Sequence, residues 1–222
     1  MNYLSAMSFF DVFPTFDESP YSYTIAPMLL ITGIIGIYSK NFRYKLLLHP
    51  YEICRGNRRH TLLTSALVHR NWLHLLFNLF VIYGLAYDMY GCLAQEQGVW
   101  IAVFATPILF VAITVFSNLL QTLIKRNDFM FTALGASGLS FGLFGFSFFY
   151  FPLQKTSHSI FPFIKNSAHY WLYALIMMLL LSFIKQVKIN RQLHIIGFLV
   201  GSLLALCVRW ESLPNLVKAW TN

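Results

Sequence analysis

Long apolar segments alternate with short polar ones along the whole chain. The apolar segments lie at about 22–39, 71–90, 99–124, 136–152, 169–187 and 192–210. Because a helix needs about 20 mostly apolar residues to cross a bilayer, we predict one membrane-spanning helix in each segment. The third is long enough to tilt. The fifth and sixth are joined by a short basic link around 188–191, so we expect them to be antiparallel neighbours.

This pattern predicts one domain over residues 21–210. A tail of residues 1–20 precedes it, and a short C-terminal tail of residues 211–222 follows it. The first 20 residues contain Asp11, Asp17 and Glu18 and no basic start, so we predict no cleavable signal peptide.

The composition agrees with a membrane protein. Of the 222 residues, 57% are hydrophobic and 11% are charged, whereas soluble domains carry about 25% charged residues. We therefore predict an all-α, multi-pass integral membrane protein with the lipid bilayer around it. The net charge of +8 does not indicate a nucleic-acid partner, because Lys and Arg in membrane proteins mark interfaces and cytosolic loops.

Two segments carry glycines at helical spacing. Gly135 directly precedes the fourth, which contains Gly138, Gly142 and Gly145, and the sixth contains Gly197 and Gly201. Within each segment, positions three or four apart share one helix face. A face without side chains lets another helix approach closely. We predict that the fourth and sixth helices pack through these faces.

One hydroxyl and one imidazole lie beside these glycines. Ser137 precedes Gly138, and His194 lies three positions before Gly197. With two spans between them, the fourth and sixth helices run in the same direction, so Ser137 and His194 should meet. A histidine can act as the base that a serine nucleophile needs, and the N–H groups of a helix N-terminus can stabilise an oxyanion. No carboxylate lies nearby, so the pattern predicts a Ser–His dyad.

The second segment adds more intramembrane polar groups. His74 and Asn78 are four residues apart on one face, and polar side chains inside a span are functional candidates. Both can donate hydrogen bonds to an oxyanion. His69 precedes the helix, for which Asn71 is the expected N-cap, and a structural role is favoured for it. His69, His74 and His194 lack the pairing and the carboxylate of a zinc site, so we expect no metal.

Together, "HRNWLHLLFN", "GASG" and "HIIGFLVG" resemble the motifs of the rhomboid intramembrane serine proteases. The resemblance covers about residues 50–210. It implies a six-helix bundle with a long first loop partly embedded in the membrane. It also implies Ser137 as nucleophile, His194 as general base and acid, and an oxyanion hole formed by His74, Asn78 and the Ser137 backbone N–H.

The same resemblance implies the remaining functional expectations. Gly197 and Gly201 would let the sixth helix approach the fourth, and His69 would be structural. The activity would be hydrolysis of peptide bonds in or near the transmembrane segment of single-span membrane-protein substrates, with no cofactor. The sequence leaves the oligomeric state and the substrates open.

The chain departs from the family pattern at three places. His60 and Thr61 stand where the family often has Trp-Arg, Phe141 stands where it often has a tyrosine, and Asp88 replaces a glutamate. Phe141 keeps an aromatic ring for stacking on His194 but lacks the hydroxyl. These changes bear on the stability of the first loop and on the catalytic rate.

Two lines of reasoning conflict on orientation. Six-helix relatives place the N-terminus in the cytosol, with the active site on the outer side of a plasma or inner membrane. The loop after the first span carries Lys40, Arg43, Lys45, Arg55, Arg58 and Arg59, and positive-inside reasoning would put that loop in the cytosol. Basic side chains at the interface can snorkel, and we favour the family orientation.

Two other functions stay open. One is a catalytically inactive relative that binds membrane clients, although such proteins usually lack the serine or the histidine. The other is a transporter, but the spans contain no array of Asp, Glu or Lys and no inverted repeat.

Overall fold

Six apolar helices form the body of the molecule, in the predicted order. The computed structural model describes residues 14–155, 164–183 and 190–221. Their helices are α1 (Pro20–Tyr38), α2 (Lys40–Leu46), α3 (Pro50–Cys54), α4 (Thr61–Thr64), the 3-10 helix Ser65–Leu67, α5 (Trp72–Gln97), α6 (Val99–Lys125), α7 (Ser137–Tyr150), α8 (Ser167–Ser182), α9 (Arg191–Val208) and α10 (Ser212–Thr221). Within these ranges there is no strand, so the predicted all-α class is confirmed.

The predicted spans correspond to α1, α5, α6, α7, α8 and α9. Four of them, α1, α5, α6 and α9, are long and apolar enough to cross a membrane. The predicted second span, residues 71–90, was too short, because α5 continues to Gln97. The link between the fifth and sixth spans and most of the N-terminal tail lie outside the described residues.

Helix α7 is shorter than a bilayer is thick. Its 14 residues cover about 21 Å at about 1.5 Å per residue, whereas the hydrocarbon core is about 30 Å thick. The two ends of α7 therefore cannot both reach a membrane surface. The segment that leads into α7 must extend into the membrane to meet the first residue of the helix.

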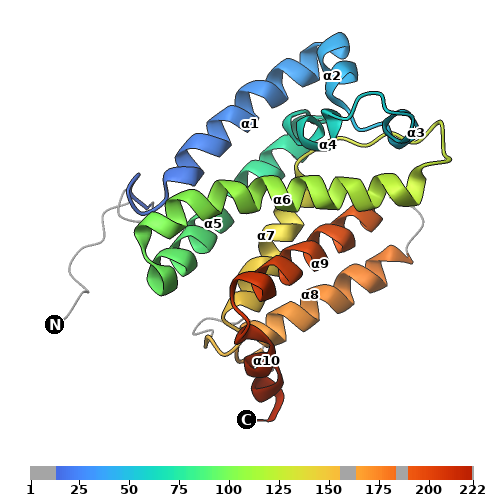
Figure 1. Cartoon of the computed structure of the whole chain (residues 1–222). Coiled ribbons are helices and arrows are strands. Elements are labelled where there is room, and N and C mark those ends of the chain that lie inside the picture. Colours follow the sequence, from blue (N-terminus) through green and yellow to red (C-terminus); the bar gives the residue numbers. More distant parts are fainter. Residues whose placement is uncertain (1–13, 156–163, 184–189, 222) are drawn as a thin grey trace.

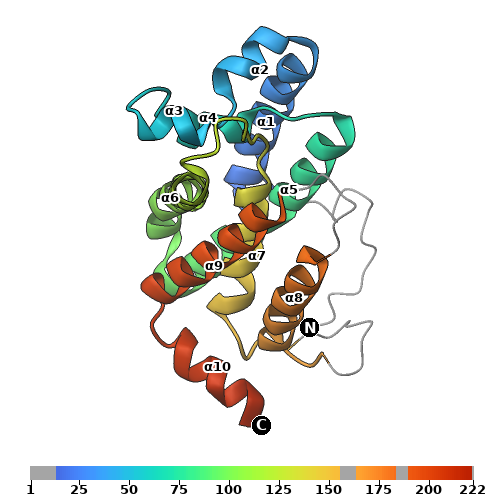
Figure 2. The same cartoon turned by 90° about the vertical axis from the view of Figure 1, so that its right-hand side faces the viewer.

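Helix α7 is also the centre of the fold, and it contacts α5, α6, α8 and α9 (Figures 1 and 2). Of its 14 residues, 11 are buried, including all three of its glycines. Because α7 is surrounded by other helices, most of its residues face protein rather than lipid.

Helices α7 and α9 touch through their backbones. A Cβ atom added to Gly197 would lie 2.3 Å from the carbonyl oxygen of Gly138, and one added to Gly201 would lie 1.8 Å from that of Gly142. The residue numbers increase together in the two helices, so they run in the same direction. This is the glycine-face packing that the spacing predicted.

The first loop, from α2 to the 3-10 helix, is closed by hydrogen bonds to backbone carbonyls. Arg58 donates to the oxygen of Leu47 at 3.2 Å, and a ring nitrogen of His60 lies 3.1 Å from the oxygen of Lys45. Leu48 pairs with Ala133 of the segment that leads into α7. Basic and polar side chains thus hold this loop together without the Trp-Arg pair.

The predicted C-terminal tail contains a helix. Residues 212–221 form α10 (Ser212–Thr221). Ser212 Oγ and Arg209 donate to the carbonyl oxygen of Tyr150 at 2.9 and 3.2 Å. These bonds satisfy a backbone group at the end of α7 that has no partner within its own helix, which explains why the tail is ordered there.

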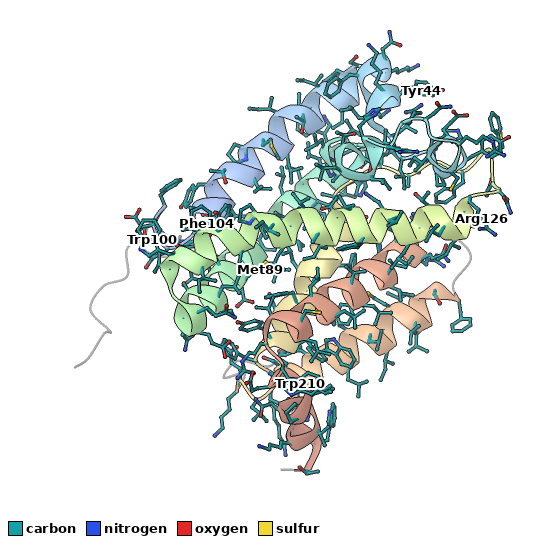
Figure 3. All side chains as sticks on the ribbon, viewed as in Figure 1. Tyr44, Met89, Trp100, Phe104, Arg126 and Trp210 are labelled. Carbon is teal, nitrogen blue, oxygen red and sulfur yellow. The ribbon has the colours of Figure 1, made fainter. Side chains whose placement is uncertain are left out.

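The outer surface is apolar and aromatic. Trp100 and Phe104 point away from one end of α6, and Arg126 follows its other end (Figure 3). Trp210 is exposed beyond α9. Exposed tryptophans near helix ends are typical of membrane–water interfaces, so the molecule has the surface of an integral membrane protein.

Candidate active site

Ser137 is the first residue of α7. Its side chain is buried, and its backbone N–H belongs to the first turn, where N–H groups have no partner within the helix. The site therefore combines a hydroxyl with nearby N–H donors, as an oxyanion requires.

His194 lies on the same side of α7 as Ser137. Its ring stacks on Phe141, with 4.2 Å between the ring centroids and 16° between the planes. Phe141 and Ser137 are four residues apart and share a helix face. No hydrogen bond joins Ser137 Oγ and the His194 ring in the described part of the chain. Such bonds are often long in substrate-free enzymes and shorten when substrate binds.

His74 lies against the turn that precedes Ser137. Asn71 is the N-cap of α5, as predicted, and its side chain accepts from the backbone N–H of His74 at 2.9 Å. The His74 ring packs on the backbone of Gly135, where an added Cβ would lie 2.3 Å from Cε1. Gly135 also has a φ of +109°, so a side chain would be excluded here by both contact and conformation.

His69 holds the segment before Ser137. The backbone N–H of Ala136 donates to its Nε2 at 3.3 Å, and the ring is fully buried. Burial, together with the neighbouring His74, lowers the pKa of His69 to about 3. The ring is therefore neutral, with Nε2 as acceptor. This contact supports the structural role expected for His69.

Asn78 is fully buried and faces the first turn of α7. Its Nδ2 donates to the carbonyl oxygen of His74 at 2.8 Å, and its Oδ1 accepts from Ser140 Oγ at 2.8 Å. Ser140 was not predicted as a site residue. A hydroxyl three residues after Ser137 in an apolar segment was the available signal.

The polar groups form one cluster. The rings of His69 and His74 are 5.1 Å apart between centroids. His69, His74 and Asn78 thus contact the turn before α7 or its first turn, and His194 stacks on Phe141, four residues after Ser137. No group of His, Cys, Asp and Glu suited to a metal ion occurs among the described residues.

Two cavities adjoin α7. The smaller, about 250 Å³, lies between α7, α8 and α9 beside Phe141. Its lining is apolar and consists of Phe141, Phe144, Phe148, Ala174, Met177, Met178, Leu181 and Phe198. The larger, about 570 Å³, includes Asp88 and Arg209 and lies at the far end of α7 from Ser137.

The arrangement places Ser137 at the start of a buried helix and the His194 ring on Phe141, one turn further along. A family model for the Rhomboid domain matches residues 56–211. The chain belongs to the rhomboid family. A comparison with curated proteins found no match. The rhomboid domain covers the first loop from Gly56, all three motif helices and the start of the C-terminal segment, so the fold and the family agree.

Membership of the rhomboid family does not by itself establish protease activity. Rhomboids include intramembrane serine proteases and also inactive relatives. The match and the apolar helices together make this rhomboid an integral membrane protein. Which of the two kinds it is depends on the cluster around Ser137.

Proposed function

We propose that this rhomboid is an active intramembrane serine endopeptidase that uses Ser137 and His194 as a catalytic dyad. The observation that carries the proposal is the backbone contact between Gly138 and Gly197, because it brings the helix starts that bear the dyad together. Stacking on Phe141 supports it by restricting the His194 ring.

The reaction would proceed in two stages. His194 takes the proton of Ser137 as Oγ attacks the substrate carbonyl carbon, and the oxyanion accepts from the Ser137 backbone N–H, His74 and Asn78. His194 then protonates the leaving amine, and the C–N bond breaks to give an acyl-enzyme. His194 next takes a proton from water, the resulting hydroxide attacks the acyl group, and Ser137 regains its proton.

The expected substrates are single-span membrane proteins with a weak helix at the cleavage site. Helical carbonyls are hydrogen-bonded and shielded, so a substrate must unwind to reach Ser137. Gly and Pro near the cleavage site should favour cleavage. By analogy with the family, substrates would pass beside α8, and the apolar cavity beside Phe141 supports that route.

The decisive experiment is labelling of the purified protein with a fluorophosphonate in detergent. Wild type should be labelled and should cleave a single-span substrate found by co-expression. Ser137→Ala and His194→Ala should still insert but lose both activities. Retained turnover in Ser137→Ala would refute the serine mechanism. A folded wild type that neither reacts nor cleaves would instead favour an inactive rhomboid that binds membrane clients.

A further inference from the structure

Outside the proposed dyad, a buried hydrogen bond between Ser140 and Asn78 links α7 to α5. Ser140 is fully buried, and its Oγ lies 2.8 Å from Asn78 Oδ1 and 3.2 Å from the carbonyl oxygen of Ala136. A hydroxyl has one proton to donate, and the shorter contact is the one to Asn78. The Ser140 hydroxyl is therefore committed to Asn78 rather than to a substrate.

The link fixes how the Asn78 amide is presented. Its Nδ2 donates one proton to the carbonyl oxygen of His74 at 2.8 Å. Turning the amide over would set Oδ1 against that carbonyl oxygen, so this contact determines which end is nitrogen. Ser140 holds the other end. With both ends held, the amide plane has one orientation.

One donor of Asn78 is left over. An amide nitrogen has two protons, and within the described residues only one is used. Hydrogen bonds in series also strengthen one another. Donation from Ser140 to Oδ1 therefore makes the remaining N–H a better donor.

We propose that Ser140 is a positioning residue that aims and strengthens the Asn78 donor of the oxyanion hole. The proposal rests on the proposed function, because it needs an oxyanion at Ser137. It assigns the hydroxyl a part in transition-state stabilisation without contact to substrate. Since the oxyanion forms only on the way to the transition state, loss of Ser140 should lower kcat and leave KM unchanged.

The test is a double-mutant cycle on the full-length protein in detergent. The measured quantity is the rate constant for fluorophosphonate labelling, since phosphonylation of Ser137 also charges an oxygen in the oxyanion hole. Asn78→Ala should slow labelling about 100-fold, and Ser140→Ala about 10-fold, as expected for one buried hydrogen bond. Ser140→Ala should have no further effect in the Asn78→Ala background.

Matched variants separate positioning from packing. Ser140→Thr keeps the hydroxyl and should label like wild type. Ser140→Cys keeps the volume but donates weakly and should be slow. This second variant replaces Ser140→Ala if alanine prevents folding. Ser147→Ala, at a buried serine about two turns further along α7, should leave the labelling rate unchanged.

The outcomes distinguish the two proposals. If wild type is labelled but the Ser140 and Asn78 effects multiply independently, the positioning role is refuted and the protease proposal stands. The same holds if Ser140→Cys labels at the wild-type rate. If folded wild type is not labelled and cleaves nothing, the protease proposal fails, and this inference fails with it.

Discussion

At the scale of single residues, the candidate site depends on neighbours that take no part in bond making. His194 owes its ring orientation to Phe141, and the turn before Ser137 owes its position to His69 and Gly135. Each of these contacts involves a backbone segment or a ring that must be held in place. Substitutions at these supporting residues should therefore change rate or stability while the dyad itself stays intact.

Replacing Phe141 tests the first of these contacts. Phe141→Ala removes the ring that stacks on His194, and a stacked aromatic pair contributes about 1 kcal/mol. We expect kcat for substrate cleavage to fall about 5- to 10-fold. Phe141→Tyr keeps the stack and should stay within about twofold of wild type. An unchanged kcat in Phe141→Ala would show that the stack does not restrain His194.

His69 predicts a dependence of stability on pH. Its pKa is lowered to about 3 in the fold, against about 6.5 in an unfolded chain. Between these values the unfolded state binds the proton and the folded state does not, so unfolding becomes easier as pH falls from about 6.5 towards 3. Protonation would also place an N–H on Nε2, facing the Ala136 N–H.

The measurement is the melting temperature in detergent across that pH range. Wild type should lose melting temperature as the solution is acidified. His69→Gln has no proton to gain and can still accept from Ala136 with its side-chain oxygen, so its pH dependence should be shallower. If the melting temperatures of wild type and His69→Gln fall equally with pH, His69 is not the source of the acid sensitivity.

At the scale of elements, two backbones in contact decide where α7 and α9 sit. Gly142 and Gly145 on α7 and Gly197 and Gly201 on α9 all approach backbone atoms of the opposite helix. Ser202 Oγ lies 2.9 Å from the carbonyl oxygen of Phe198 in its own helix and 3.2 Å from that of Gly145, which places a polar side chain at this contact as well. Backbone cannot yield as a flexible side chain can, so this contact tolerates no added atoms.

Gly201→Ala is the sharpest test of that contact. The new Cβ would lie 1.8 Å from the carbonyl oxygen of Gly142, so the helices must separate. We expect a loss of at least about 2 kcal/mol, which is within the range for overpacking, together with strongly reduced cleavage. The control is Gly84→Ala on α5, where nothing lies within 4 Å of the added Cβ. Alanine is the better helix former there, so the melting temperature should stay equal or rise.

At the scale of the whole molecule, the basic first loop bears on orientation. Arg43 donates to the carbonyl oxygen of Gly36 at 3.3 Å, Arg55 to that of Tyr51 at 3.1 Å, and Arg58 to that of Leu47 at 3.2 Å. These side chains are engaged in closing helix ends within the loop. Their positive charge therefore has a structural reason that does not depend on the side of the membrane.

These contacts weaken the positive-inside argument, and from the family resemblance we expect the N-terminus to lie in the cytosol. A cysteine in an N-terminal tag should be protected from a membrane-impermeant maleimide in intact cells and should react after permeabilisation. For this test the native Cys54, Cys92 and Cys207 should be replaced by serine or alanine. Labelling of the tag in intact cells would support the positive-inside reading instead.

The sequence by itself determined the elements, and it predicted the residues of the candidate site. Apolar length located six helices, because a bilayer admits few other ways to satisfy backbone polar groups. Glycine spacing located the contact between α7 and α9, because 3.6 residues per turn places those glycines on one face. Spacing and the family resemblance predicted Asn71 as the N-cap. They also predicted the grouping of Ser137, His74, Asn78 and His194.

Only the tertiary structure decided the contacts between segments far apart in the chain. The bond from Ala136 to His69, the link from Ser140 to Asn78 and the helix formed by residues 212–221 all depend on partners dozens of residues away. Helical periodicity determines which face of its helix a residue occupies, but not which group of another segment contacts it. That pairing is fixed only when the whole bundle closes and every buried polar group must find a partner.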